Sequence, residues 1–439
     1  MKKKFSMIVK ESLEHVWHPC SRMADYSELN LLPIKSGDKS WLIAEDGKKY
    51  FDSISSWWVN LFGHNNPFIK KRIIAQLNKI EHVMLSGMTH EPVVDLSRKL
   101  KILTNLDHCF YSSDGSSAVE IALKISFHYW KNKGFNKKTK FAMLSDSYHG
   151  ETIGALSVTD VDIFSNNYKG LLLKNFLLPN PSPKEYSNEK ALKAYALESF
   201  EKARVILEKN HNSIAGLIIE PIVQCASGMN CYHPVYLKKM RQLCKKLNIH
   251  LIADEIAVGF GRTGKMFACE HASINPDILC LSKGLSGGYL PLAATLVCKK
   301  IYNEFLDAKI DRTFLHSHSF TGNPLACSAA LATLDFFEDK QVMEALDKKI
   351  TKFDSFISKL NEFEINNYKN IGMIWRFDLP ERFSAKQFEQ FSRDEKILLR
   401  PIGQTIYFMP PLSTTIKDIK FLVKAIRKVF IKLGVECVK

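Results

Sequence analysis

Two charged side chains stand at the ends of apolar stretches, where a buried charge is costly unless the protein uses it. Asp254 ends the run IHLIAD (249–254), and Lys283 follows the run ILCLS (278–282). A lysine amine attacks a carbonyl only when it is deprotonated, and burial favours that form. A nearby carboxylate keeps a pyridinium nitrogen protonated. The pair therefore suits pyridoxal phosphate (PLP), with Lys283 and Asp254 as catalytic residues.

The same cofactor needs a phosphate site and an aromatic face. The segment YSSDGSSAVEIALKIS (111–126) has the pattern of a strand, a turn and a helix, and backbone amides at a helix N-terminus bind anions. Gly115 allows close approach of the backbone, and Ser116 adds a hydroxyl. Tyr148 follows another apolar run and is the candidate that stacks on the cofactor ring.

Each of these residues also has a structural explanation. A lysine can extend from a strand end to solvent, and an aspartate can cap a loop. The segment with Gly115 and Ser116 can be no more than a well-capped helix, and a lone tyrosine can be structural. We favour the cofactor site because four such signals follow successive strands in an order that suits one ligand.

These residues need a sheet to bring them together. Short apolar runs alternate with helical patterns between residues 105 and 300, and continuous apolar runs predict a mostly parallel sheet covered on both faces. The runs are HCFYS (108–112), FAMLS (141–145), AGLIIE (215–220), IHLIAD (249–254), ILCLS (278–282) and LAATLVC (292–298). Ligands bind outside the carboxyl ends of such strands. We therefore expect an α/β fold in which Ser113 to Ser116, Tyr148, Glu220, Asp254 and Lys283 meet in one cleft.

The chain is long enough for two or three domains. Residues 61–334 form the predicted large, cofactor-binding domain, and residues 335–439 form a smaller α+β domain with helices over 340–363 and 416–434. Residues 1–60 are predicted as an N-terminal arm or part of the small domain. They include a hairpin in SWLIAEDGKKYFDS (40–53), with its turn at Asp-Gly.

Composition narrows the class of protein. The ten cysteines are scattered singly without metal-ligand spacing, which predicts reduced thiols and no metal site. The basic start, residues 2–4, precedes an apolar run too short for a signal peptide, and no run reaches the roughly 20 residues of a membrane span. We expect a cytoplasmic enzyme.

The net charge of +15 raises the alternative of a nucleic-acid-binding protein. The lysines, however, are dispersed in short clusters, as on a solvated surface.

Three blocks of sequence resemble the class III PLP-dependent aminotransferases. They are IADEIAVGFGRTGKMFACEH (252–271), PDILCLSKGLSGGYLPLAAT (276–295) and SFTGNPLACSAAL (319–331). Six further blocks resemble the branch of this family that acts in biotin synthesis, including FDSISSWWVNLFGHNNP (51–67) and RPIGQTIYFMPPL (400–412). The resemblance implies the type I, aspartate-aminotransferase-like fold and a homodimer. It also implies transamination of 8-amino-7-oxononanoate to 7,8-diaminononanoate, with S-adenosylmethionine as amino donor.

The resemblance also implies roles for individual residues. Lys283 would hold PLP and move a proton, Asp254 would pair with the pyridine nitrogen, and Tyr148 would stack on the ring. Gly115 and Ser116 would bind the phosphate, and Ser319 would reach the phosphate of the neighbouring subunit. The substrate would contact Tyr148 and Lys283 together with Trp57, beside Trp58, and with Ser317, Arg400 and Tyr407. Arg400 would bind the substrate carboxylate, for which a guanidinium is suited.

Four positions depart from the usual pattern of that branch. Cys20 replaces a tyrosine and Glu151 replaces an aspartate, while Ser317 and His318 differ from Gly-Pro. The lysine-using relatives also lack the tyrosine, whereas the pair Trp57–Trp58 is typical of the adenosylmethionine-using enzymes. Lysine as the donor and another class III ω-aminotransferase activity therefore stay open as alternatives.

Overall fold

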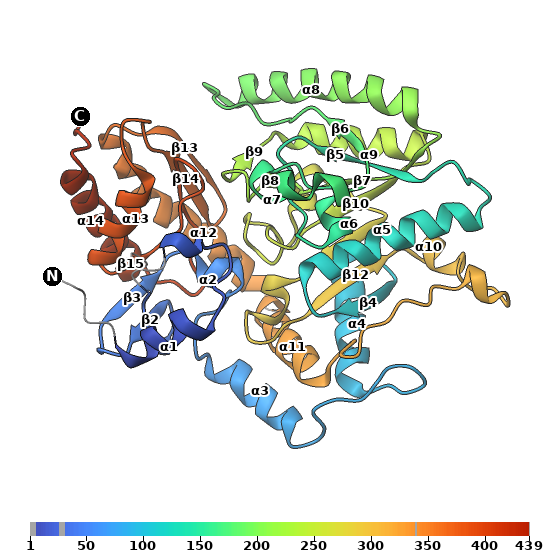
Figure 1. Ribbon diagram of the computed structural model, residues 1–439, viewed down its shortest axis with the longest axis horizontal. Helices are drawn as coiled ribbons and strands as arrows, with labels where there is room; N and C mark the ends of the chain where they lie inside the picture. The colour runs from blue at the N-terminus through green and yellow to red at the C-terminus, as the bar shows by residue number, and fades with distance from the viewer. Residues whose placement is uncertain (1–5, 26–30, 339, 439) are drawn as a thin grey trace.

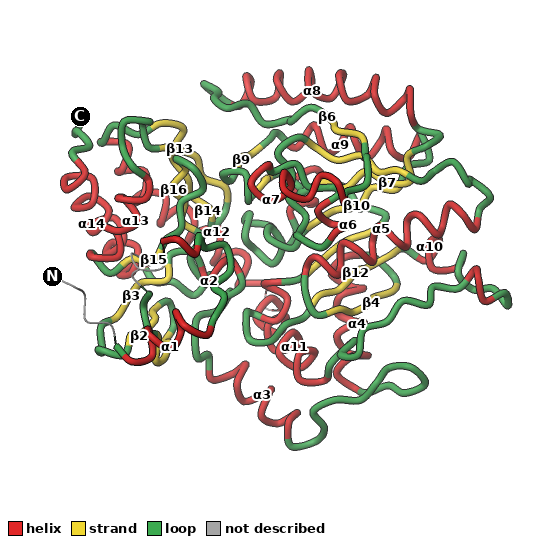
Figure 2. Tube along the Cα trace, in the orientation of Figure 1, coloured by secondary structure: helices red, strands yellow, loops and turns green. Residues whose placement is uncertain are grey.

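The computed structural model describes residues 6–25, 31–338 and 340–438. The basic start of the chain, residues 2–4, lies outside these ranges. A seven-stranded sheet forms the centre of the larger lobe, in the order β4-β12-β11-β10-β7-β5-β6 (Figures 1 and 2). Its strands are β4 (His108–Ser112), β5 (Lys140–Leu144), β6 (Phe176–Leu178), β7 (Ile214–Ile219), β10 (His250–Asp254), β11 (Ile278–Leu281) and β12 (Ala293–Val297).

All six predicted strands are present in this sheet. Only β12 runs antiparallel to its neighbours, β11 and β4, so the sheet is mostly parallel, as expected. Strand β6 was not predicted. It has three residues at the sheet edge, and so short a run lacks the continuous apolar pattern of a central strand.

Helices cover both faces of the sheet because its strands are apolar on both sides. Within β7, Leu217 and Ile219 join one core cluster and Ile218 joins the other, as the alternation of side chains in a strand requires. Helix α5 (Gly115–Asn132) packs with the second cluster. Helices α8 (Glu189–Asn210) and α9 (Pro234–Lys246) pack on the opposite face (Figure 2).

The remaining helices of the larger lobe lie around this core. Helices α3 (Pro67–Leu77), α4 (Glu91–Thr104) and α11 (Pro324–Glu338) pack together. Shorter segments connect the strands, and they are α6 (Ile153–Leu156), α7 (Asp162–Ser165), α10 (Lys299–Asn303), β8 (Val223–Gln224) and β9 (Asn230–Cys231).

Both ends of the chain contribute to the smaller lobe. The predicted hairpin is confirmed as β2 (Trp41–Ala44) and β3 (Lys49–Asp52), and these join β1 (Ile34–Asp38) and β15 (Ile397–Leu398) in the order β1-β2-β3-β15. A second sheet has the order β13-β14-β16, with β13 (Asn366–Ile371), β14 (Ile374–Asp378) and β16 (Thr405–Phe408). Among the described residues, the helices of this lobe are α1 (Met7–His15), α2 (Ser55–Trp58), α12 (Lys340–Ile357), α13 (Ala385–Asp394) and α14 (Ile416–Leu433).

The parallel pairing of β3 with β15 joins residues about 345 positions apart in the sequence. In Figure 1 the N-terminal strands lie beside the C-terminal helices, on the same side of the larger lobe. This pairing supports our proposal that residues 1–60 belong with the C-terminal small domain and that 61–334 form the large domain.

One buried arginine connects three parts of the chain. Arg262 is 1% exposed, and its guanidinium donates to the carbonyl oxygens of Pro410 at 2.6 Å and Asn60 at 3.0 Å. Burial lowers the pKa of Arg262 to about 9. The arginine thus links the loop after β10 both to the N-terminal segment and to the segment after β16.

We expect Arg262→Ala to destabilise the protein by about 2–4 kcal/mol, because it leaves buried carbonyls unpaired and creates a cavity. Arg204→Ala removes an exposed arginine that pairs with Glu201 and Glu208, and we expect a cost below about 1 kcal/mol. Urea denaturation measures both. Equal midpoints for the two variants would contradict the role of Arg262 as a link.

Candidate functional site

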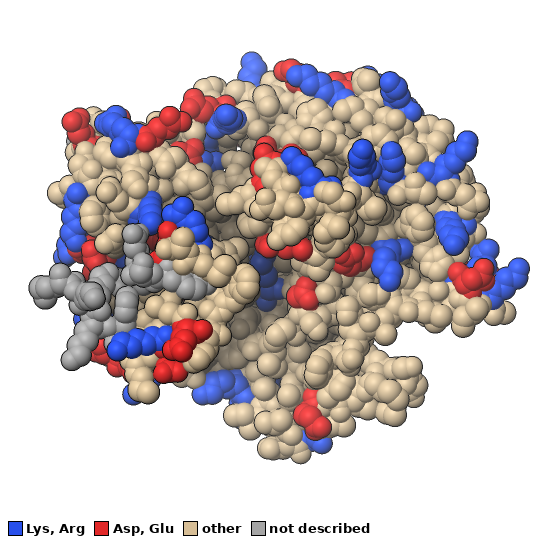
Figure 3. All heavy atoms as spheres, in the orientation of Figure 1, with Lys and Arg blue, Asp and Glu red and all other residues tan. Residues whose placement is uncertain are grey.

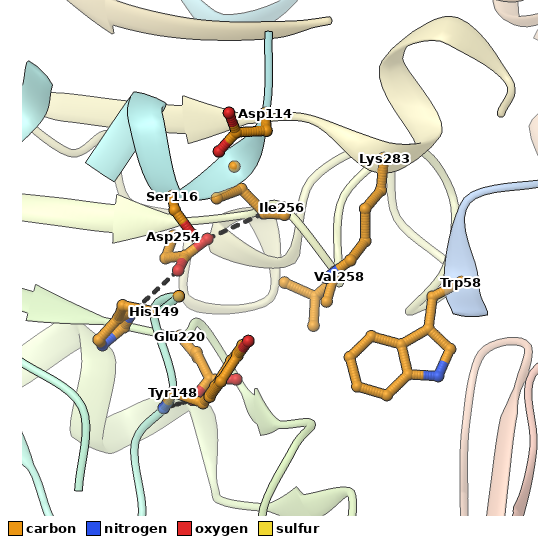
Figure 4. Close-up of a pocket in the computed structure, with 13 residues that line it drawn as sticks. Trp58, Asp114, Ser116, Tyr148, His149, Glu220, Asp254, Ile256, Val258 and Lys283 are labelled. Atoms are coloured by element: carbon orange, nitrogen blue, oxygen red, sulfur yellow. Dashed lines mark hydrogen bonds and ion pairs between the residues drawn. The ribbon is translucent and has the colours of Figure 1, made fainter. Parts of the chain in front are cut away.

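A pocket opens at the carboxyl ends of the central strands (Figure 4). Its volume is about 190 Å³, and it is lined by Trp58, Asp114, Gly115, Ser116, Tyr148, His149, Gly150, Glu220, Asp254, Ile256, Ala257, Val258 and Lys283. The structure therefore brings together the strand-end residues expected to meet, except that Ser113 is not part of the lining.

Lys283 follows β11 and begins a short 3-10 helix, Lys283–Ser286. Its backbone has a φ of +44°, which is costly for a residue other than glycine. The amine lies 4.8 Å from the centre of the Trp58 ring, and no ion pair joins it to any part of the chain that the structure describes. Burial lowers the pKa of Lys283, which makes the nucleophilic form of the amine more accessible.

Asp254 ends β10 on the other side of the pocket (Figure 4). The residue is 5% exposed. Its Oδ1 accepts a hydrogen bond from the backbone N–H of Ile256 at 3.1 Å, and its Oδ2 accepts one from Nδ1 of His149 at 2.7 Å. The carboxylate is therefore fixed in direction, as a partner for a protonated ring nitrogen must be.

Two buried ionisable residues of the pocket were given no catalytic or binding role by the sequence, although Glu220 was expected to lie in the cleft. One is His149, whose Nε2 is buried without a hydrogen-bond partner among the described residues. The other is Glu220, whose carboxylate accepts from the backbone N–H groups of Tyr148 at 3.1 Å and Cys225 at 2.9 Å. Burial raises the pKa of Glu220 to about 7, and Asp254 adds to this rise. His149 directly follows Tyr148, and Glu220 is the last residue of the run AGLIIE (215–220), so both were signalled by their place at strand ends.

The N-terminus of α5 lines one end of the pocket. Asp114 caps the helix by accepting from the backbone N–H of Ser117 at 2.9 Å. A Cβ at Gly115 would lie 3.0 Å from Ile256, and a Cβ at Gly150 would lie 2.1 Å from Oγ of Ser116. A side chain would overlap Ser116 at position 150 and would crowd Ile256 at position 115, so glycine at both positions lets the backbone amides approach a ligand directly.

Tyr148 lies in the lower part of the pocket in Figure 4, and Lys283 enters it from above. The tyrosine hydroxyl donates to Glu151 at 2.9 Å, and its ring lies 5.1 Å from that of Phe164. Burial raises the pKa of Tyr148 far above its ordinary value, with Glu151 adding to the rise, so the residue is a neutral phenol. Its ring is placed to cover a ligand between Asp254 and Lys283.

The predicted substrate residues are divided between the pocket and its surroundings. Trp58, and not Trp57, lines the pocket. Trp57 is 39% exposed. The guanidinium of Arg400 lies over its ring, 4.6 Å from the ring centre. Arg400 also donates to the backbone oxygen of Cys20 at 2.8 Å. Tyr407 is buried behind Trp58 and accepts a hydrogen bond from its indole N–H at 3.1 Å.

The two tryptophans belong to α2 (Ser55–Trp58), which has an unusual backbone. All four residues have positive φ values, between +47° and +72°. A left-handed conformation costs a residue other than glycine roughly 1–2 kcal/mol, so the segment stores about 4–8 kcal/mol. Contacts elsewhere in the fold must offset that cost.

Ser317 and Ser319 are not brought to this pocket by their own chain. Both are exposed and lie in the segment between the 3-10 helix Ile310–Arg312 and α11. His318 lies between them, and its Nε2 is 3.1 Å from Nε2 of His316.

Comparison with known proteins gives one consistent family. The sequence pattern described as "Aminotransferase class-III" matches residues 23–430. The adenosylmethionine-8-amino-7-oxononanoate aminotransferase of Helicobacter pylori is 44% identical over 93% of this chain and 94% of its own. The Staphylococcus aureus enzyme of the same name is 38% identical over 94% of this chain and 95% of its own.

Solved structures agree with the sequence relatives. The crystal structure of the Methanocaldococcus jannaschii enzyme of that name has a TM-score of 0.90 and 36% identity, over 97% of this chain and 99% of its own. A PLP-bound amine transaminase from an uncultivated Pseudomonas species has a TM-score of 0.88 and 30% identity, over 96% of this chain and 99% of its own.

The raised pKa of Glu220 predicts a pH dependence of stability. Between pH 4.5 and about 7 the folded protein holds a proton that the unfolded chain releases, so rising pH removes stability. Relative to Glu220→Gln, which has no such proton, we expect the wild-type unfolding free energy to decline by up to about 3 kcal/mol across this window.

Chemical denaturation of cofactor-free protein at several pH values measures this decline. Glu198→Gln is the control because Glu198 pairs with Lys202 on the solvent-exposed surface of α8, and we expect this variant to follow wild type across the window. Parallel pH curves for wild type and Glu220→Gln would show that Glu220 is ionised throughout.

Proposed function

The chain belongs to the class III aminotransferase family, and from this premise we propose that it converts 8-amino-7-oxononanoate to 7,8-diaminononanoate with S-adenosylmethionine as the amino donor. The protein is a PLP-dependent aminotransferase with the type I fold. The observation that carries the proposed reaction is the presence in one pocket of a buried amine, Lys283, and a fixed carboxylate, Asp254. The choice of substrates rests on the names of relatives that are 35–44% identical over most of the chain.

The pocket fits PLP by the chemistry of its own groups. The closed positions at Gly115 and Gly150 leave a backbone cradle at the α5 N-terminus for the phosphate. Asp254 would hold the ring N–H, Tyr148 would cover the ring, and the amine of Lys283 would hold the aldehyde end. When bound, PLP supplies an electron-withdrawing ring that allows a proton to leave the substrate carbon beside nitrogen.

The chain's own groups then bind and move protons. Burial lowers the pKa of Lys283, so its Nζ would be suited to take a proton from the donor carbon beside nitrogen and to deliver it to the aldehyde carbon of the cofactor. Asp254 stays oriented by His149 and the backbone of Ile256, so the ring nitrogen keeps its proton. Arg400 binds the carboxylate of the keto substrate, and Trp57 supports Arg400 from below.

Ser317 and Ser319 serve the pocket of a partner subunit in a homodimer. Their exposure on the segment before α11, outside the pocket of their own chain, supports this arrangement. Two active sites would then be shared across the interface. A monomer would be inactive.

The proposal excludes membranes and nucleic acid as partners. No helix within residues 6–25, 31–338 and 340–438 is long and apolar enough to cross a membrane. On the face drawn in Figure 3, basic and acidic side chains are interspersed, which supports a solvated surface in place of a nucleic-acid site. We retain the cytoplasmic location as part of the proposal, and the absence of any disulfide among the described cysteines is consistent with it.

A single-turnover absorbance experiment tests the donor. Enzyme loaded with PLP is mixed with S-adenosylmethionine or with lysine, and we expect the cofactor to convert to its amino form with S-adenosylmethionine only. Lys283→Ala should convert with neither, because no amine is left to move the proton. Conversion by lysine alone would assign the chain to the lysine-using alternative, which Cys20 in place of the tyrosine favours.

Subunit mixing tests the shared site. Lys283→Ala lacks the amine, and Ser319→Asp places a negative charge where the partner's phosphate would lie, so each variant alone should be inactive. After mixed refolding, half of the dimers are mixed and each has one intact site, which predicts about a quarter of wild-type turnover. No recovery of activity, in mixtures shown to contain mixed dimers, would place Ser319 outside the partner's site.

A further inference from the structure

The segment Ser55–Trp58 has a conformation that its sequence does not favour. Four consecutive residues other than glycine have φ values of +51°, +47°, +68° and +72°. Residues with a Cβ rarely adopt this region, and then as single residues. An isolated left-handed turn of this length persists only where surrounding groups hold it.

Asp52 is the group that holds the turn most directly. It is 1% exposed and ends β3, which is paired on one side with β2 and on the other with β15. Its Oδ1 accepts from the backbone N–H of Ser56 at 2.9 Å, and its Oδ2 accepts from the Ser56 hydroxyl at 2.8 Å. The imidazole of His64 completes the set, with Nε2 2.9 Å from Oδ2.

Two further contacts fasten the ends of the turn. The Ser55 hydroxyl donates to the backbone oxygen of Met409 at 2.7 Å, and the Trp58 indole donates to Tyr407. Both acceptors belong to β16 or the residue after it. The turn is therefore fixed against both parts of the smaller lobe, and Asp52 is its only charged anchor among these contacts.

The turn contacts two basic side chains through consecutive rings. The amine of Lys283 lies over Trp58 at 4.8 Å, and the guanidinium of Arg400 lies over Trp57 at 4.6 Å. In the proposed reaction these two side chains act at opposite ends of the keto substrate, since Lys283 acts at the ketone carbon and Arg400 binds the carboxylate. The backbone between the two tryptophans thus influences the distance that the substrate must span.

We propose that Asp52 is a positioning residue that holds Ser55–Trp58 in its left-handed turn, and that this turn sets the separation of Lys283 from Arg400 and thereby the chain length of the accepted substrate. The substrate class is an amino ketone that ends in a carboxylate. This inference rests on the proposed function, because it takes the roles of Lys283 and Arg400 from it.

A homologous series of substrates tests the proposal. Amino ketones with a terminal carboxylate, shorter and longer than 8-amino-7-oxononanoate by one or two methylene groups, are compared by kcat/KM. For wild type we expect a maximum at one length and a loss of about tenfold or more for each methylene away from it. For Asp52→Ala we expect nearly equal kcat/KM values across the series, because the distance between the Lys283 amine and the Arg400 guanidinium is no longer fixed.

A second substitution, glycine at position 56, distinguishes a loss of the turn conformation from general damage to the fold. Glycine adopts the left-handed region without penalty, so adding Ser56→Gly to Asp52→Ala should restore the wild-type length preference. Ser273→Gly is the matched control, because Ser273 is another serine with positive φ (+51°) and lies outside the pocket. Added to Asp52→Ala, it should leave the preference flat. Hydrogen exchange of the backbone amides of residues 55–58 should be faster in Asp52→Ala than in wild type.

The outcomes distinguish this inference from the proposed function. A wild-type enzyme that does not aminate 8-amino-7-oxononanoate overturns both. A wild-type maximum that Asp52→Ala retains, with unchanged amide exchange, overturns the role of Asp52 alone. If Asp52→Ala does not fold, Asp52→Asn decides the question, because its single acceptor oxygen should weaken the length preference, and an unchanged preference overturns the inference.

Discussion

The burial of the Lys283 amine, with no ion pair to a carboxylate among the described residues, is the constraint on which the rest of the site depends. Lys283 lies between the Trp58 ring and the strand ends, and burial lowers its pKa. A parallel sheet makes this possible, because its strand ends are the one place where backbone amides, a fixed carboxylate and a buried amine converge from distant parts of the chain. Burial disfavours the charged ammonium form of Lys283 and so favours the neutral amine, which is the nucleophilic form.

Lys283 and the turn Ser55–Trp58, which it contacts through Trp58, both have positive φ. Each costs free energy that the surrounding contacts must offset, and those contacts join different parts of the chain: Arg262 to Asn60 and Pro410, and Ser55 to Met409. These contacts therefore stabilise the fold, and they also keep the residues that line the pocket in backbone conformations that would be unfavourable in isolation.

Much of this arrangement could be predicted from the sequence. The central strands are continuous apolar runs, so the ends of β7, β10 and β11 were predicted within one residue. Polar residues at the ends of apolar strands are unusual unless they have a function, and this identified Asp254, Lys283 and the segment before α5. Strand β6 was too short to be found, and Glu220 was seen only as a polar residue at a strand end. The hydrogen bonds of Asp52 to Ser56 could not be predicted, because nothing in the sequence of a hairpin that ends in aspartate indicates a left-handed turn after it.

The sequence by itself therefore determined the fold class, the cofactor chemistry and the residues that meet at the strand ends, because periodicity and residue type act locally along the chain. Only the tertiary structure decided that Trp58 and not Trp57 lines the pocket, that Arg400 lies on Trp57, and that Ser317 and Ser319 lie outside it. Those facts depend on a left-handed turn and on contacts between residues hundreds of positions apart. No local pattern encodes them, because the free energy that holds the turn comes from groups that the fold brings to it.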